Sequence, residues 1–126
     1  MTETRTVRVM LVEDHADFRR LLASVVDREV DLEVVAQAGS LEEARGRMEP
    51  AGCDVAVLDM GLPDGVGSDL VAGLREACPG SAVLILSASL DASNRARAKE
   101  AGADGVLDKF GDPAEVVEEI RRLGAG

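Results

Sequence analysis

Five short apolar runs, each followed by a longer stretch with helical spacing, constrain the fold of this chain more than any other feature. The expected strands cover residues 7–12, 32–38, 55–58, 82–86 and 105–107. Consecutive positions within each run are apolar, which indicates strands covered on both faces, as in a parallel sheet with helices on each side. Five strands are too few for an eight-stranded barrel, so the pattern predicts an open, doubly wound α/β sheet.

Local signals place the ends of the helices between these strands. Helices are expected at 15–28, from 40 to the Pro50–Gly52 segment, at 69–77, at 91–101, and from 112 onward. Ser40 and Glu43 form a capping box at the second helix, and Asp112 with Pro113 forms the start of the last. Residues 61–67 contain one proline and three glycines, which predicts a loop after the third strand.

Length and charge exclude several classes of protein. The 126 residues indicate one domain, 1–126, with loose ends expected at 1–5 and 124–126. The net charge of −10 argues against nucleic-acid binding. Two cysteines are too few for a disulfide framework, and the first residues lack the apolar core of a signal peptide, so a reducing cytoplasm is expected. No apolar run approaches the ~20 residues of a membrane span.

Polar residues follow four of the five expected strands. They are Glu13 and Asp14 after the first, Asp59 after the third, Ser87 after the fourth, and Asp108 and Lys109 after the fifth. In open α/β sheets, ligands bind outside the carboxyl ends of the strands. The sequence therefore predicts one pocket that contains several carboxylates, one hydroxyl and one ammonium group.

This set of groups suits phosphoryl transfer. Carboxylates that lie close together repel each other, and a hard divalent cation such as Mg²⁺ resolves the repulsion while it also binds phosphate oxygens. A carboxylate can itself attack phosphorus and form an aspartyl phosphate. Such a reaction needs alignment and charge neutralisation, which a metal ion, a lysine and a hydroxyl can supply.

Four segments give the chain a family resemblance: VEDH at 12–15, LDMGLPDGVG at 58–67, ILSAS at 85–89 and GVLDK at 105–109. Each lies at the end of an expected strand, and together the sequence resembles a response-regulator receiver domain over essentially its whole length. The EDH and LPDG segments are most similar to receivers attached to LuxR-type helix-turn-helix output domains. The resemblance implies a flavodoxin-like (βα)5 fold with strand order 2-1-3-4-5.

The resemblance also implies a role for each site residue. Asp59 is the expected phosphoacceptor. Asp14, Glu13, Asp59 and the backbone carbonyl of Gly61 are the expected ligands of Mg²⁺ or Mn²⁺. Ser87 and Lys109 are expected to contact the phosphoryl group, and Ser87 is expected to move toward it on activation.

Two positions depart from the family pattern. Many receivers have an aromatic residue three positions before the lysine, where this chain has Val106, and a cis proline directly after it, where this chain has Phe110. A cis bond before a non-proline residue costs ~2.5–4 kcal/mol, so a trans bond is expected here. Neither departure removes a residue implied in phosphorylation, but Val106 leaves open how a signal reaches the surface.

The expected partners follow from the same resemblance. A sensor histidine kinase is the expected phosphodonor, and the face made by the fourth helix, fifth strand and fifth helix is the expected surface for an output domain or a second copy. No nucleic-acid or membrane contact is expected. The chain contains no output domain and ends just after its last expected helix, which fits either a stand-alone regulator or a piece of a transcription factor.

Other readings of the same residues stay open. His15 is interpreted as a helix-start residue, Asp64 as a turn residue, Asp108 as a neighbour that points away from the pocket, and Gly65 and Gly67 as positions that need backbone freedom.

A phosphatase with an aspartate nucleophile would need a second aspartate two residues later, where this chain has Gly61. The chain is expected to catalyse only its own phosphorylation and dephosphorylation. A constitutive interaction module, which would not need phosphorylation, is the remaining alternative.

Overall fold

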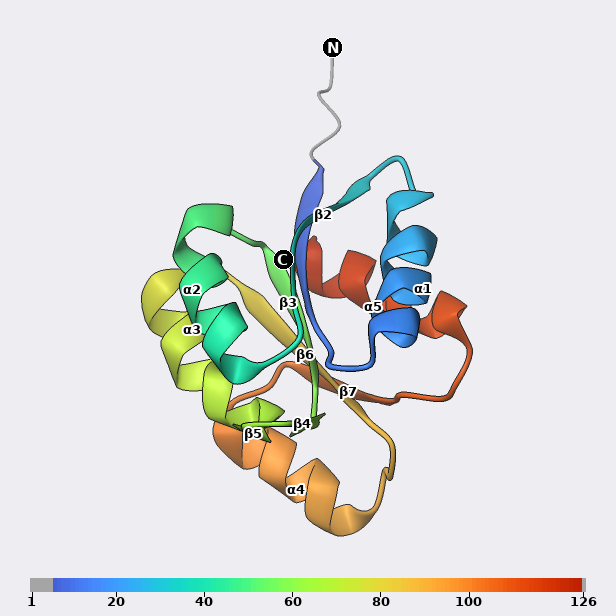
Figure 1. The fold of residues 1–126 in the computed structure, drawn as a ribbon. Coiled ribbons are helices and arrows are strands. Elements are labelled where there is room, and N and C mark those ends of the chain that lie inside the picture. The colour runs from blue at the N-terminus through green and yellow to red at the C-terminus, as the bar shows by residue number, and fades with distance from the viewer. Residues whose placement is uncertain (1–5, 126) are drawn as a thin grey trace.

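A parallel sheet forms the middle layer of the computed structural model, which describes residues 6–125 (Figure 1). Its strand order is β2-β1-β3-β6-β7. The strands are β1 (Val7–Val12), β2 (Leu32–Ala38), β3 (Val55–Asp59), β6 (Ala82–Ser87) and β7 (Gly105–Asp108). All four neighbouring pairs are parallel. The predicted doubly wound sheet and its order 2-1-3-4-5 are therefore confirmed.

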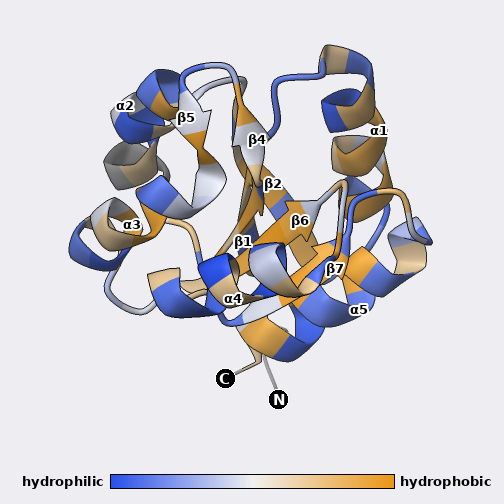
Figure 2. Cartoon of the chain, turned by 90° about the horizontal axis from the view of Figure 1, so that it is seen from below, coloured by the Kyte–Doolittle hydropathy of each residue, from blue (hydrophilic) through white to orange (hydrophobic). Residues whose placement is uncertain are grey.

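Helices cover both faces of this sheet. The helices α1 (Ala16–Asp27) and α5 (Pro113–Gly124) pack on one face, and α2 (Leu41–Ala51), α3 (Val71–Ala77) and α4 (Ala92–Ala101) lie on the other (Figure 1). Successive side chains of a strand point to opposite faces. In β1, Val9 and Leu11 contact the α1–α5 layer, whereas Met10 and Val12 contact the opposite layer. Figure 2 shows the hydrophobic colouring concentrated on the central strands, as two-sided burial requires.

The predicted helix ends are largely confirmed. Ser40 accepts a hydrogen bond from the backbone N–H of Glu43 at 3.1 Å, and Asp112 accepts one from Ala114 at 2.9 Å with Pro113 in the first turn. Asp91 caps α4 in the same way. The helix α5 extends to Gly124, one residue into the segment expected to be loose, and residues 1–5 and 126 lie outside the described residues.

The segment expected to be a plain loop contains more structure than predicted. The two-residue strands β4 (Gly61–Leu62) and β5 (Gly65–Val66) pair antiparallel there. A single 3₁₀ turn, η1 (Gly67–Leu70), then precedes α3, so the third helix begins later than the expected residue 69. None of the helices within residues 6–125 has the length and apolar character needed to cross a bilayer.

Glycine is required at the two loop positions for different physical reasons. Gly65 has φ +156°, where side chains are rarely tolerated, so the expectation of backbone freedom is correct there. Gly67 has no positive φ, and that expectation is wrong for it. A Cβ on Gly67 would lie 2.0 Å from the carbonyl oxygen of Asp59. Gly67 is therefore required because η1 packs directly against the end of β3.

Candidate functional site

The carboxyl ends of four neighbouring strands bring the predicted site residues to one edge of the sheet. Glu13 and Asp14 follow β1, Asp59 ends β3, Ser87 ends β6 and Lys109 follows β7. A hollow at this edge is lined by Asp14, Asp59, Met60, Gly61, Ser87, Ala88, Ser89, Asn94 and Lys109. Five residues that are up to 96 positions apart in the sequence thus meet because parallel strands all end on the same side.

Three carboxylates form the acidic part of the site. One ligand oxygen from each of Glu13, Asp14 and Asp59 lies within 4.8 Å of the others. Glu13 and Asp59 are buried, at 3% and 5% exposure, whereas Asp14 is exposed to the hollow. Oxygen donors in a partly open cluster are what Mg²⁺ binds, because this ion keeps several of its waters. The residues present therefore fit the cation that the sequence implied.

Lys109 neutralises part of this charge. Its Nζ lies 2.6 Å from Glu13 Oε1 and 3.2 Å from Asp59 Oδ2. Burial alone would lower the pKa of Lys109, but the hydrogen bond that it donates to Glu13 and the charge of Asp59 outweigh burial and raise the pKa. The ammonium group thus stays charged, directly beside the proposed acceptor.

The pKa of the Glu13 carboxyl group is strongly raised. Burial, followed by the hydrogen bond with Asp59, raises the pKa of Glu13 to about 7, and Lys109 opposes this only in part. One lysine cannot balance several carboxylates in a desolvated position. The remaining negative charge of the site therefore favours binding of a further cation.

Ser87 is buried at the opposite wall. Its hydroxyl donates to the carbonyl oxygen of Ser89 at 2.8 Å, and the side-chain amide of Asn94 donates to the same carbonyl at 2.8 Å. Asp91, which caps α4, accepts from Ser89 Oγ at 3.4 Å. Ser87 is therefore linked through its own loop to the first turn of α4. No role is predicted for Ser89 or Asn94 from the sequence, because neither residue directly follows a strand.

Three residues that were predicted to have structural roles lie outside the acidic cluster. His15 is the N-cap of α1, where its Nδ1 accepts from the N–H of Phe18 at 3.1 Å. Asp108 is exposed and accepts from the N–H of Phe110 rather than facing the hollow. Asp64 does more than form a turn, because its carboxylate accepts from the N–H groups of Leu41 and Glu42 and so supports the start of α2.

Of the two family departures, one lies within β7 and the other lies just after it. Val106 is half-buried and lines a shallow hollow between α4 and β7. Phe110 is 70% exposed. Residues 6–125 contain no cis peptide bond, so the trans bond expected before Phe110 is confirmed.

Comparison with known proteins agrees with this geometry. The profile of the response regulator receiver domain family matches residues 9–121. The chain is 38% identical to the DNA-binding transcriptional activator DevR/DosR of Mycobacterium tuberculosis over 120 residues, which are 95% of this chain and 55% of that protein. It is 33% identical to the nitrate/nitrite response regulator protein NarP of Escherichia coli, over all of this chain and 59% of that protein.

Solved structures give the same result. A LuxR-family two-component response regulator from Aurantimonas sp. SI85-9A1 has a TM-score of 0.88 at 32% identity, covering 96% of this chain and 86% of that one. The signal receiver domain of the putative response regulator NarL from Mycobacterium tuberculosis has a TM-score of 0.89 at 27% identity, covering 97% and 98%. This chain spans a little over half the length of DevR/DosR and of NarP.

Proposed function

Because this chain belongs to the response regulator receiver domain family, we propose that it is switched by transfer of a phosphoryl group to Asp59. It is a receiver domain of two-component signalling, related to LuxR-type regulators of transcription. One observation carries the proposal for the acceptor. Asp59 is the carboxylate of the acidic cluster that both lines the hollow and contacts the ammonium group of Lys109, whereas Glu13 does not line the hollow and Asp14 does not contact the lysine.

In the proposed reaction a carboxylate oxygen of Asp59 attacks the phosphorus of a phosphohistidine on a sensor histidine kinase. A P–O bond to Asp59 forms as the P–N bond breaks, and the leaving imidazole keeps the bonding electron pair and takes up a proton. Lys109, already 3.2 Å from Asp59, pairs with an oxygen of the transferred group. This transfer depends on alignment and charge neutralisation, and the fixed lysine contributes to both.

Glu13, Asp14, Asp59 and the backbone carbonyl of Gly61 would hold Mg²⁺ or Mn²⁺ beside the acceptor. When bound, the ion supplies positive charge to the phosphoryl oxygens. The three carboxylates lie close enough together to share one ion. Gly61 lines the same hollow, and its N–H donates to Asp59 Oδ1 at 3.2 Å.

Ser87 carries the proposed conformational response. Its hydroxyl leaves the carbonyl of Ser89 and contacts a phosphoryl oxygen, and the loop that leads to the N-cap of α4, Asp91, moves with it. Support for this comes from the bond between Ser87 and Ser89, which connects the site to α4. With Val106 in place of an aromatic residue, the response passes through this loop rather than through a side chain of β7.

The proposed output surface is the face formed by α4, β7 and α5. We place an output domain or a second copy of the chain there, in a cytoplasmic pathway that controls transcription. DevR/DosR is a DNA-binding transcriptional activator and extends well beyond the matched region. Receiver domains are typically not enzymes, so the proposed chemistry is limited to phosphorylation and dephosphorylation of Asp59 itself. Gly61, where a phosphatase would need a second aspartate, disfavours the enzyme alternative.

The test is the intact mass of the protein after incubation with acetyl phosphate and Mg²⁺. We expect the parent chain to gain one phosphoryl group, and Asp59→Asn to gain none, because the amide is not a nucleophile. Asp108→Asn is the matched control, since Asp108 also ends a strand but faces away from the hollow. Equal labelling of parent and Asp59→Asn would reject Asp59 as acceptor, and an unlabelled parent would favour the constitutive interaction module.

A further inference from the structure

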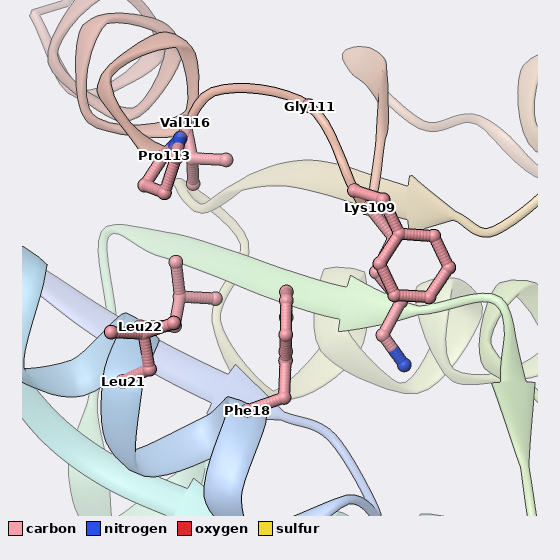
Figure 3. Close-up of a pocket in the computed structure, with 8 residues that line it drawn as sticks. Phe18, Leu21, Leu22, Lys109, Gly111, Pro113 and Val116 are labelled. Carbon is pink, nitrogen blue, oxygen red and sulfur yellow. The ribbon is translucent and has the colours of Figure 1, made fainter.

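Lys109 lies between two unlike surroundings. Its side chain lines the acidic hollow, and it also lines an apolar groove together with Phe18, Leu21, Leu22, Phe110, Gly111, Pro113 and Val116. Figure 3 shows this groove, with Phe18 rising from α1 next to Lys109 and Leu21 on the far side. The side chain of Lys109 is only 12% exposed. Lys109 therefore borders an acidic hollow and an apolar groove, with little of its own side chain exposed.

The sequence contains two aromatic residues, and both lie against this lysine. Phe18 and Phe110 are its only phenylalanines, and it has no tyrosine or tryptophan. Lys109 Nζ lies 5.0 Å from the ring centroid of Phe18 and 5.8 Å from that of Phe110. The two rings are 6.4 Å apart and meet edge to face at 77°. Both distances fall within the ~6 Å range of cation–π attraction.

The hydrogen-bonding capacity of the ammonium group explains how these rings could position it. It has three N–H donors, of which Glu13 and Asp59 accept two. A third carboxylate on the remaining side would compete with the phosphoryl group for the lysine. A ring face attracts the cation without offering a strong acceptor, so it can hold the group in place and leave it available.

A purely structural explanation covers Phe18 better than Phe110. Phe18 also packs partly against the core formed by α1 and α5. Phe110 is 70% exposed and belongs to neither core cluster. Core packing therefore does not account for an aromatic ring at position 110, whereas contact with Lys109 and Phe18 does.

We propose that Phe18 and Phe110 form an aromatic bracket that positions the ammonium group of Lys109 for the phosphoryl group on Asp59. Both are positioning residues, because they act through the lysine. The inference rests on the proposed function for its effect on rate, but the bracket itself is a property of the resting protein. Phe110 gives the cleaner test, since its exposure means that substitutions there leave the core intact.

Two variants separate the ring from its bulk. Phe110→Leu keeps an apolar side chain and removes the ring face, whereas Phe110→Tyr keeps the ring. We expect Phe110→Leu to slow phosphorylation by acetyl phosphate about two- to five-fold, the effect of losing one exposed cation–π contact. Phe110→Tyr should stay close to the parent rate. Leu21→Ala is the control, because it removes apolar surface from the same groove on the side away from Lys109.

A spectrum of the lysines provides a second readout that rate alone cannot give. The chain has two lysines, so a sample labelled with ¹³C-lysine gives one Cε–Hε signal for Lys109 and one for Lys99. Ring currents should shift the Lys109 signal upfield of Lys99, and Phe110→Leu should move it back toward Lys99. Phe110→Tyr and Leu21→Ala should leave it in place.

The outcomes are distinguishable. An unmoved Lys109 signal in Phe110→Leu overturns the bracket, whatever the rate does. Equal slowing by Phe110→Leu and Phe110→Tyr also overturns it, because the ring would then not be the cause. A parent that takes up no phosphoryl group counts against the proposed function alone, since the lysine spectrum still decides whether the bracket exists.

Discussion

The two walls of the candidate site differ in how firmly the fold holds them. One wall contains the buried carboxylates of Glu13 and Asp59, their shared contact with Lys109, and Gly67 packed against the Asp59 backbone. The other wall is the loop that leads from Ser87 into α4, a helix that buries only Ala98 among its residues. Segments with few buried contacts open most readily. We therefore distinguish a firmly held wall, which contains the proposed acceptor, from a loosely held wall, which contains the proposed switch residue Ser87.

Gly67→Ala should break the firmly held wall and have the largest effect. The added Cβ would meet backbone atoms of Asp59 at 2.0 and 2.9 Å, and backbone cannot move aside as a flexible side chain can. We expect a loss of about 3 kcal/mol in the free energy of unfolding, the upper end for overpacking, measured by urea denaturation. Gly61→Ala is the control, since a Cβ there meets nothing within 4 Å. Equal effects of the two substitutions would contradict the close packing of η1 on β3.

The next largest effect concerns Glu13 and pH. The folded-state pKa of Glu13 is raised to about 7 from 4.5, so without metal the folded chain binds more protons than the unfolded chain between these values. Stability contributed by this group is therefore present below about pH 4.5 and is lost as the pH rises toward 7. Comparison of urea unfolding at pH 5 and 7 in EDTA should show a decline that Glu13→Gln reduces by about 1–3 kcal/mol.

Adding Mg²⁺ sharpens this prediction. The cation replaces the proton that Glu13 would otherwise hold, so it should stabilise the parent more at pH 7 than at pH 5. Glu13→Gln should show a weaker dependence of the Mg²⁺ effect on pH. Parent and variant with the same pH dependence would show that burial of Glu13 does not govern this part of the site.

Asp91→Ala tests the loosely held wall. Asp91 accepts from the N–H of Asn94 at 2.8 Å as the N-cap of α4, and loss of such a cap costs about 1 kcal/mol. Because α4 is weakly attached, we expect faster amide exchange within α4 and little change in α5. Asp91→Asn, which keeps a capping oxygen, should behave as the parent. Faster exchange throughout the chain would mean that α4 is coupled to the whole fold.

Ser87→Ala should have the smallest effect on stability, about 0.5 kcal/mol, because the carbonyl of Ser89 that loses the Ser87 hydroxyl still accepts from the side-chain amide of Asn94. Ser81→Ala is the matched control. Ser81 is also buried, yet its hydroxyl has no hydrogen-bond partner among the described residues, so its removal should be neutral or stabilising. If both variants lose the same stability, the Ser87 hydroxyl is not held by its loop.

The sequence predicted the sheet well because burial on both faces leaves a direct signal of consecutive apolar residues. Strand ends then located Glu13, Asp14, Asp59, Ser87 and Lys109 without any tertiary information. In a parallel sheet, the residue that follows each strand must lie at the same edge. This is why a candidate site drawn from four distant segments could be predicted from one sequence.

Contacts between loops and helices left no comparable signal. The position of Gly67 against Asp59 depends on how η1 packs, and glycine in a loop reads equally well as backbone freedom. Asp64 reaches the start of α2 across 22–23 residues of sequence. The contact of Phe110 with Lys109 and Phe18 likewise needs the three-dimensional arrangement of β7 and α1. The spacing of residues in the sequence alone therefore cannot predict such contacts.

Hydrogen exchange of one sample before and after phosphorylation tests the comparison of the two walls most directly. Intact mass would first establish that Asp59 is phosphorylated, and exchange would then be compared for α4 (Ala92–Ala101) and α5 (Pro113–Gly124). We predict a large change in the amides of α4 and the loop after Ser87, with α5 nearly unchanged. Fully phosphorylated protein in which α4 exchanges as before, or in which α5 changes as much as α4, would contradict the claim that the loosely held wall carries the response.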